Sequence, residues 1–125
     1  MRVLLAFEEA YRVYMSAMEA AIRQFRPEVE VRAAAAADAE QLEAEVERFE
    51  PHLVICSPPV PENPVEDRIA RIELSSEPSE PSRFRVGKRA WESVNPTLGE
   101  ILPVIEETKK LLRSTSQEAA EGQAQ

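Results

Sequence analysis

The chain has 125 residues, which is enough for one domain with a single core and too few for two domains with separate cores. Hydrophobic residues make up 43% of it and charged residues 30%, so most of the chain is neither collagen-like nor disordered. With 15 Lys and Arg against 23 Asp and Glu, the formal net charge is −8, and nucleic acid and anionic membranes are poor partners because both are polyanions.

The ends and the cysteine content favour an ordinary cytoplasmic protein. Cys56 is the only cysteine, so no disulfide can form within the chain, and we interpret Cys56 as a buried structural residue. The apolar run at residues 2–7 is too short for a signal peptide, and no run approaches the ~20 apolar residues that span a bilayer. We therefore expect a cytoplasmic location and no membrane partner.

The first part of the chain predicts a strand, a helix and a second strand. Residues 2–7 form a continuous apolar run that is typical of a buried strand, and residues 8–26 then show helical spacing. Residues 28–34 alternate between charged and apolar side chains, which predicts a strand with one exposed face. The expected apolar stripe of the helix comprises Ala10, Val13, Tyr14, Ala17, Met18, Ala21, Ile22 and Phe25.

A second helix and a third strand complete a regular alternation. Asp38 and Gln41 have capping-box spacing at the start of a helix over residues 38–50. Residues 52–57 then form a second short apolar run, which predicts a strand buried on both faces. The order strand, helix, strand, helix, strand with short connections predicts a parallel sheet.

The pattern changes after Ser57, where four prolines among residues 58–64 exclude a helix. Residues 68–75 alternate like a strand, and Gly87-Lys88 has the composition of a tight turn between two further strands. We therefore expect residues 68–94 to form an antiparallel meander that is appended to the parallel unit.

The last helix is expected to open at Asn95-Pro96, which combines a capping residue with a proline. From Ser114 the chain lacks apolar residues larger than Ala, so we expect residues 114–125 to be a disordered tail and residues 1–113 to be a single domain. The predicted fold is a three-layer α/β sandwich of flavodoxin or receiver type. Its mixed sheet has a parallel core of order 2-1-3, followed by the antiparallel meander, and there are about three helices.

Two stretches resemble the front half of bacterial response-regulator receiver domains. They read Val3-Leu4-Leu5-Ala6-Phe7-Glu8-Glu9 and Pro51-His52-Leu53-Val54-Ile55-Cys56-Ser57. The resemblance places Ser57 where the family carries its phosphoacceptor aspartate, and it places Phe7 and Glu8 on the metal-binding acids. Ser75 and Lys88 loosely match the Ser or Thr and the phosphate-pairing lysine of later receiver strands.

These substitutions imply that the switch chemistry is lost. Phosphotransfer to a receiver needs a carboxylate nucleophile beside a divalent metal, whereas a serine hydroxyl needs a general base. Glu8 and Glu9 alone supply few of the oxygen ligands that Mg²⁺ requires, so no metal is expected. The sequence has no glycine-rich motif for a phosphate or a dinucleotide, so no cofactor is expected. We expect a non-catalytic, receiver-like regulatory or protein-interaction module. The alternative is a small-ligand or enzymatic site at the carboxyl edge of the sheet near Glu8, Glu9 and Ser57.

The second half of the chain carries a short basic cluster. Its members, Arg83, Arg85, Lys88 and Arg89, form either a solvated strand face or a contact for an anion or an acidic partner. We expect a protein partner or a homodimer formed through residues 68–94. The interface residues proposed on this basis are Arg71, Arg83, Arg85 and Trp91.

Overall fold

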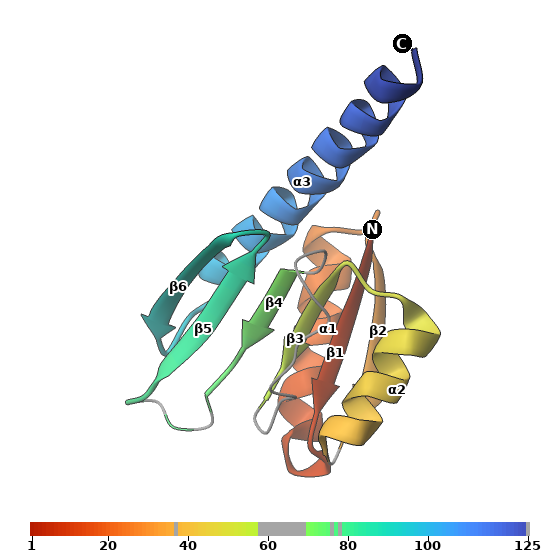
Figure 1. Ribbon diagram of the computed structural model, residues 1–125. Coiled ribbons are helices and arrows are strands. Elements are labelled where there is room, and N and C mark those ends of the chain that lie inside the picture. The colour runs from red at the N-terminus through yellow and green to blue at the C-terminus, as the bar shows by residue number, and fades with distance from the viewer. Residues whose placement is uncertain (37, 58–69, 76, 78, 125) are drawn as a thin grey trace.

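The computed structural model describes residues 1–36, 38–57, 70–75, 77 and 79–124 (Figure 1), and these form six strands, three α-helices and one short 3-10 turn. The strands are β1 (Arg2–Phe7), β2 (Glu30–Ala35), β3 (Leu53–Cys56), β4 (Ala70–Glu73), β5 (Pro81–Val86) and β6 (Arg89–Val94). The 3-10 turn η1 (Glu9–Tyr11) precedes α1 (Arg12–Phe25), and the other helices are α2 (Ala39–Phe49) and α3 (Leu98–Ala124).

All six strands belong to one mixed sheet of order β2-β1-β3-β4-β5-β6. The pairs β1–β2, β1–β3 and β3–β4 are parallel, and the pairs β4–β5 and β5–β6 are antiparallel. The predicted 2-1-3 core and antiparallel meander are thus confirmed, and β4 adds a fourth parallel strand. The turn between β5 and β6 is the expected Gly87-Lys88 turn, in which Gly87 adopts a φ of +60° that a glycine reaches without steric cost.

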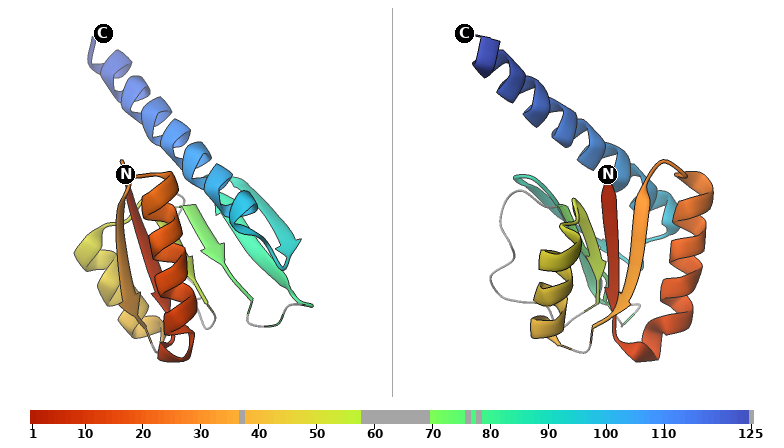
Figure 2. Two further views of the ribbon diagram at one scale, coloured as in Figure 1. Left: turned by 180° about the vertical axis from the view of Figure 1, so that it is seen from behind. Right: turned by 90° about the vertical axis from the view of Figure 1, so that its right-hand side faces the viewer.

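The helices cover the sheet in three layers, as the sequence predicts (Figure 2). On one face, alternate residues of β1 pack against α1 and α3, with Met15, Ile22 and Ile105 among the buried contacts. On the other face, the intervening residues of β1 and β3 pack against Leu42 and Val46 of α2. Among the described residues, no helix combines the length and the apolarity that crossing a bilayer requires.

The first predicted helix differs from the structure in its buried stripe. The side chains that α1 buries are Met15, Met18 and Ile22, whereas Val13 is 84% exposed and Phe25 is 51% exposed. The three buried residues are spaced by three and four positions, and the expected stripe includes Met18 and Ile22 but not Met15. The cap of α2 is confirmed, since the Asp38 carboxylate accepts a hydrogen bond of 2.9 Å from the Gln41 amide.

The last helix begins and ends later than expected. Thr97, not Asn95, is the residue before its first turn, and the Glu100 carboxylate reaches back to accept a hydrogen bond of 3.1 Å from the Thr97 amide. The backbone stays helical to Ala124, so the predicted disordered tail differs from the structure, where the end of α3 projects beyond the sheet (Figure 1). Residues 114–124 include Ala, Glu and Gln but no proline, and extending an existing helix through such residues costs little.

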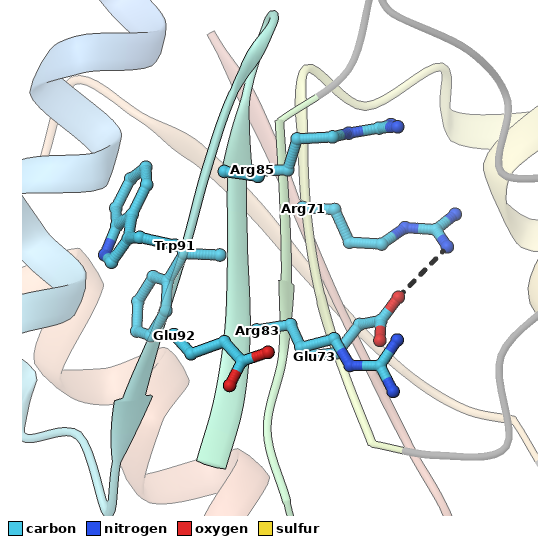
Figure 3. Close-up of a pocket in the computed structure, with 8 residues that line it drawn as sticks. Arg71, Glu73, Arg83, Arg85, Trp91 and Glu92 are labelled. Carbon is cyan, nitrogen blue, oxygen red and sulfur yellow. Dashed lines mark ion pairs between the residues drawn. The ribbon is translucent and has the colours of Figure 1, made fainter.

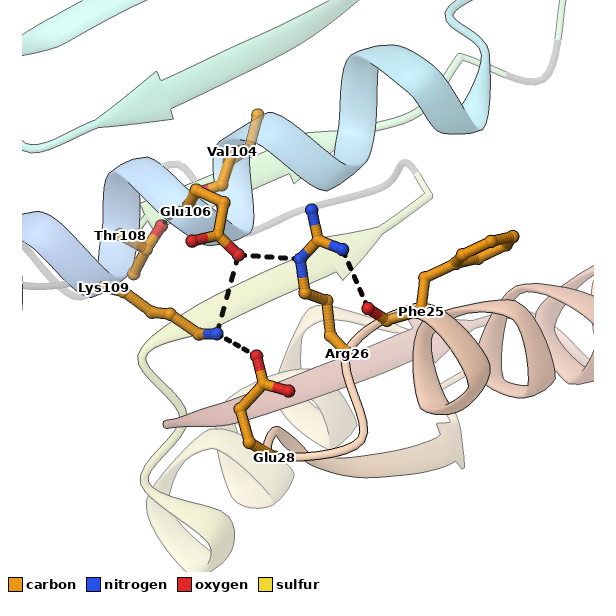
Figure 4. Close-up of polar contacts among 7 residues, drawn as sticks. All are labelled: Phe25, Arg26, Glu28, Val104, Glu106, Thr108 and Lys109. Atoms are coloured by element: carbon orange, nitrogen blue, oxygen red, sulfur yellow. Dashed lines mark hydrogen bonds and ion pairs between the residues drawn. The ribbon is translucent and has the colours of Figure 1, made fainter.

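Ion pairs join α3 to the chain just after α1 (Figure 4). Arg26 Nε contacts the Glu106 carboxylate at 2.7 Å, and Lys109 pairs with both Glu106 and Glu28. The contact with Lys109 lowers the pKa of the Glu28 carboxyl, chiefly through a side-chain hydrogen bond. These contacts fix the position of α3 over the parallel strands, which brings the start of the helix to the carboxyl edge of the sheet.

Candidate functional site: a pocket at the carboxyl edge of the sheet

The strand order reverses between β1 and β3, and in open α/β sheets such a reversal leaves a crevice at the carboxyl ends of the strands. After β1 the chain crosses one face of the sheet as α1 to reach β2, and after β2 it crosses the other face as α2 to reach β3. The two strands are neighbours, but the strand that follows β1 in the chain, β2, lies on one side of the pair, and the next described strand after β3, β4, lies on the other side. Open α/β sheets bind ligands at such a switch point.

A pocket of about 200 Å³ lies beside this crevice, on the face that α1 and α3 cover. The carboxyl ends of β1, β3 and β4 contribute Phe7, Ser57, Leu74 and Ser75, and α1, β5 and the segment before α3 complete the wall. The other lining residues are Tyr11, Tyr14, Glu77, Ser82, Asn95 and Pro96. Aromatic and apolar surface with a few polar groups is the usual composition of a small-molecule site.

Three serines supply polar groups to the pocket, and their hydroxyls differ in whether they have a hydrogen-bond partner. Ser82 Oγ accepts a hydrogen bond of 2.9 Å from the Ser75 amide, and Ser75 Oγ accepts one of 3.1 Å from the Glu77 amide. Ser57 Oγ is buried and has no hydrogen-bond partner among the described residues. A buried hydroxyl without a partner costs free energy, so Ser57 is the group that a bound ligand would satisfy.

Aromatic rings form the apolar side of the pocket. Phe7 and Tyr14 meet edge to face, with ring centroids 5.9 Å apart and an interplanar angle of 86°. Partial burial raises the pKa of the Tyr14 phenol above its usual value near 10, so the hydroxyl stays protonated and can donate a hydrogen bond at neutral pH. Glu77 is the only charged residue among the described lining residues, which favours an uncharged or cationic ligand over an anion.

Of the receiver-like residues, the structure brings Ser57 and Ser75 together in this pocket but not the others. Glu8 and Glu9 follow β1 at the same edge without lining the pocket, and Glu9 pairs with Arg12 at 3.3 Å on the surface. Lys88 lies at the opposite edge, because antiparallel β5 carries the chain back before the turn. Among the described residues, no group of three His, Cys, Asp or Glu is placed to hold a metal ion.

Cys56 takes no part in the pocket, although it precedes Ser57. Its side chain is fully buried on the other face of the sheet against α2, which confirms the structural interpretation. Burial raises the pKa of the Cys56 thiol to about 12, so the group is a neutral thiol and a poor nucleophile at neutral pH.

Sequence reasoning missed most of the pocket. Tyr11, Tyr14, Ser82 and Asn95 were not singled out as site residues, and Tyr14 was assigned to the apolar stripe of the helix. The signal that was available is positional: residues that follow or flank strand ends collect at one edge of a parallel sheet. Ser82 could not have been found in this way, because its place depends on how β5 pairs with β4.

The predicted interface residues lie on two different faces of the meander (Figure 3). Arg71, Arg83 and Arg85 project from β4 and β5 on the α2 side of the sheet. Trp91 lies on the other side, half-buried, where it stacks on Phe84 with ring centroids 5.3 Å apart. The proposed interface is therefore not one surface, and the tryptophan does not place an apolar patch beside the arginines.

Comparison with known proteins gives no family, since no family model, curated protein or solved structure shows a significant match to the chain. The function has to be argued from the pocket and the surfaces of the domain itself. The resemblance to receiver domains stays a prediction.

Two serine variants test the state of the pocket hydroxyls. Ser82→Ala removes the acceptor of the Ser75 amide, so the free energy of unfolding should fall by about 1 kcal/mol. Ser57→Ala removes an unpartnered buried hydroxyl, so the same quantity should stay unchanged or rise by up to about 1 kcal/mol. Urea unfolding of the two variants beside the wild type measures both effects. A loss in Ser57→Ala as large as that in Ser82→Ala would show that the Ser57 hydroxyl has a partner.

Proposed function

We propose that this chain is a cytoplasmic, receiver-like regulatory module of signal transduction that acts by binding and does not accept a phosphoryl group. The observation that supports the proposal is the end of β3, where Ser57, the residue that the resemblance aligns with the family's aspartate, lines a pocket whose only charged described residue is Glu77. A carboxylate nucleophile beside a metal is what phosphotransfer to a receiver requires. Neither Glu8 nor Glu9 lines the pocket that Ser57 enters.

The sheet gives the proposal further support. The parallel strands follow the order β2-β1-β3-β4, which is the order of the first four strands in doubly wound folds of the flavodoxin and receiver type. After β4 the chain departs from that pattern, because β5 and β6 form an antiparallel hairpin. A receiver-like fold thus accounts for the four parallel strands, whereas the β5–β6 hairpin is a feature that the receiver pattern does not include.

Incubation with acetyl phosphate and Mg²⁺ followed by intact mass measurement tests the proposal. We expect no stable species heavier by about 80 Da, the mass of one phosphoryl group. A receiver domain that retains its aspartate serves as the positive control for the reagent. A phosphorylated species that disappears in Ser57→Ala would contradict the proposal.

A second candidate function, binding of a small uncharged ligand, is favoured by the pocket itself. The cavity of about 200 Å³ joins an aromatic wall to the unpartnered hydroxyl of Ser57, which suits a small ring that carries a hydrogen-bonding group. Phenol is a probe of that chemistry. Its addition at millimolar concentration should shift the amide resonances of Ser57, Ser75 and Ser82 in a saturable way.

The chain offers a matched pair of variants for this titration. Tyr14→Ala removes part of the aromatic wall and should weaken phenol binding at least about threefold. Val13→Ala changes the neighbouring residue, which is 84% exposed and does not line the pocket, and it should leave the affinity unchanged. Equal affinities in the two variants, or shifts confined to residues far from the pocket, would contradict ligand binding at this site.

We also propose that the module forms a homodimer through residues 68–94, along the outer edge of β6. Among the described strands β6 is the last of the sheet on that side, and an edge strand can pair with a second copy across a two-fold axis. Light scattering at micromolar concentration should give the mass of a dimer. Val94→Lys, at a position on β6 that is 58% exposed, should reduce it to a monomer, whereas a wild-type monomer or an unaffected dimer would contradict this interface.

A further inference from the structure

A hollow of about 290 Å³ lies on the α2 side of β4, β5 and β6, away from the carboxyl-edge pocket (Figure 3). Arg71, Arg83 and Arg85 contribute their side chains to it, together with Glu73 and Glu92. These side chains project from the side of the sheet opposite to that of Phe84 and Trp91. An acidic chain therefore concentrates three guanidinium groups in one place.

The strand register divides these charges into two rows. Arg71 lies opposite Arg85, which lies opposite Ala90, so the strand residues of this row are two arginines and an alanine. In the adjacent row, Glu73 lies opposite Arg83, which lies opposite Glu92, so a cation stands between two carboxylates. Like charges directly opposite each other on neighbouring strands destabilise the sheet. An anion bound between Arg71 and Arg85 would reduce that repulsion, so we expect an anion to prefer the first row.

Arg71 is the most constrained member of the first row. Its side chain is only 8% exposed, and its buried Nε atom has no hydrogen-bond partner within the part of the chain that the structure describes. Its contact with Glu73 is 3.6 Å long, well beyond the roughly 2.7–2.9 Å of a charge-assisted hydrogen bond. A guanidinium has five N–H donors, and a buried one is strongly disfavoured when its donors are left unsatisfied.

The first row also leaves space for an oxyanion beside its two guanidinium groups. Ala90 ends it with a methyl group, so no bulky side chain from β6 fills the space beside Arg85. Arginine presents its donors as a planar fork that matches two oxygens of one anion. In the second row, the carboxylates of Glu73 and Glu92 flank Arg83 and would repel an anion placed there.

We propose that Arg71 and Arg85 form a binding site for a phosphate group, held against the α2 face of β4 and β5. The phosphate would accept from the buried Arg71 Nε and bridge to Arg85, the neighbour directly opposite on β5. Arg83 contributes less, because its charge is already flanked by two carboxylates. This site is independent of the carboxyl-edge pocket, which lies on the other face of the sheet and, among the described residues, contains no cation.

Thermal unfolding of the full chain in inorganic phosphate at pH 7.5 tests this site, with ionic strength held constant by sodium chloride. The Tm should rise in a saturable way, as expected for a ligand that binds the folded state. Arg71→Met should weaken the apparent affinity at least about tenfold. Glu73→Gln should strengthen it, because the variant removes the carboxylate that competes for Arg71.

Arg89→Met is the matched control on the same hairpin. Arg89 lies on the opposite face, where it pairs with Glu107 at 2.6 Å and covers the Trp91 ring, so its loss should lower the starting Tm but leave the phosphate response unchanged. Should Arg71→Met not fold, the wild type provides a second readout. Addition of phosphate should then shift the Arg71 Nε–H resonance in an arginine-labelled nuclear magnetic resonance spectrum.

Three outcomes would overturn the proposal. The first is an absence of any saturable effect of phosphate on Tm and on the Arg71 resonance. The second is a phosphate response in Arg71→Met equal to that of the wild type. The third is an equal response to acetate at the same concentration, which would assign the row to carboxylates instead of phosphate.

Discussion

The burial of β1 and β3 on both faces is the constraint on which the rest of the molecule depends. Every residue from Val3 to Phe7 and from Leu53 to Cys56 is at most 2% exposed. Parallel strands of this kind are stable only where both faces of the sheet are covered, and each fully buried large apolar side chain contributes about 1.5–3 kcal/mol. A stable sheet therefore requires cover on each face, and α1 and α2 provide it on opposite faces.

The two candidate sites follow from this arrangement. The strand order reverses between β1 and β3, and Ser57 and the aromatic rings collect near the carboxyl ends of these two strands. The sheet then continues through β4, β5 and β6, while α2 packs on β1 and β3. Among the described residues, the apolar cluster on the α2 side includes none from these added strands, which carry the arginine rows there. One face thus offers a pocket of aromatic rings and serines with one carboxylate, and the other face offers a hollow with three arginines.

Much of this architecture could be predicted from the sequence, because local signals decide it. Apolar runs define β1 and β3, the Asp38 carboxylate caps α2, and Gly87 turns the hairpin. The buried stripe of α1 was not predictable, since Val13 and Met15 lie on different faces that both show helical spacing. Which of these two faces packs against the sheet is a property of the tertiary structure that helical spacing alone does not specify.

The candidate site was predictable only in outline. Ser57 was placed correctly at the end of β3, since a strand's carboxyl end can be read from where its apolar run stops. Lys88 was associated with the same site, but the direction of β5 carries it to the opposite edge. The opposition of Arg71 and Arg85 depends on the register between β4 and β5, which no local pattern specifies.

Residue-resolved hydrogen exchange tests most directly whether the doubly covered strands hold the molecule together. The amides of Val3–Phe7 and Leu53–Cys56 should exchange only through global unfolding, with an opening free energy equal to that from urea unfolding. The amides of β6, which has a partner strand on one side only among the described residues, should open at lower free energy. Amides in β1 or β3 that exchange by local opening more readily than those of β6 would contradict the central place given to the buried parallel pair.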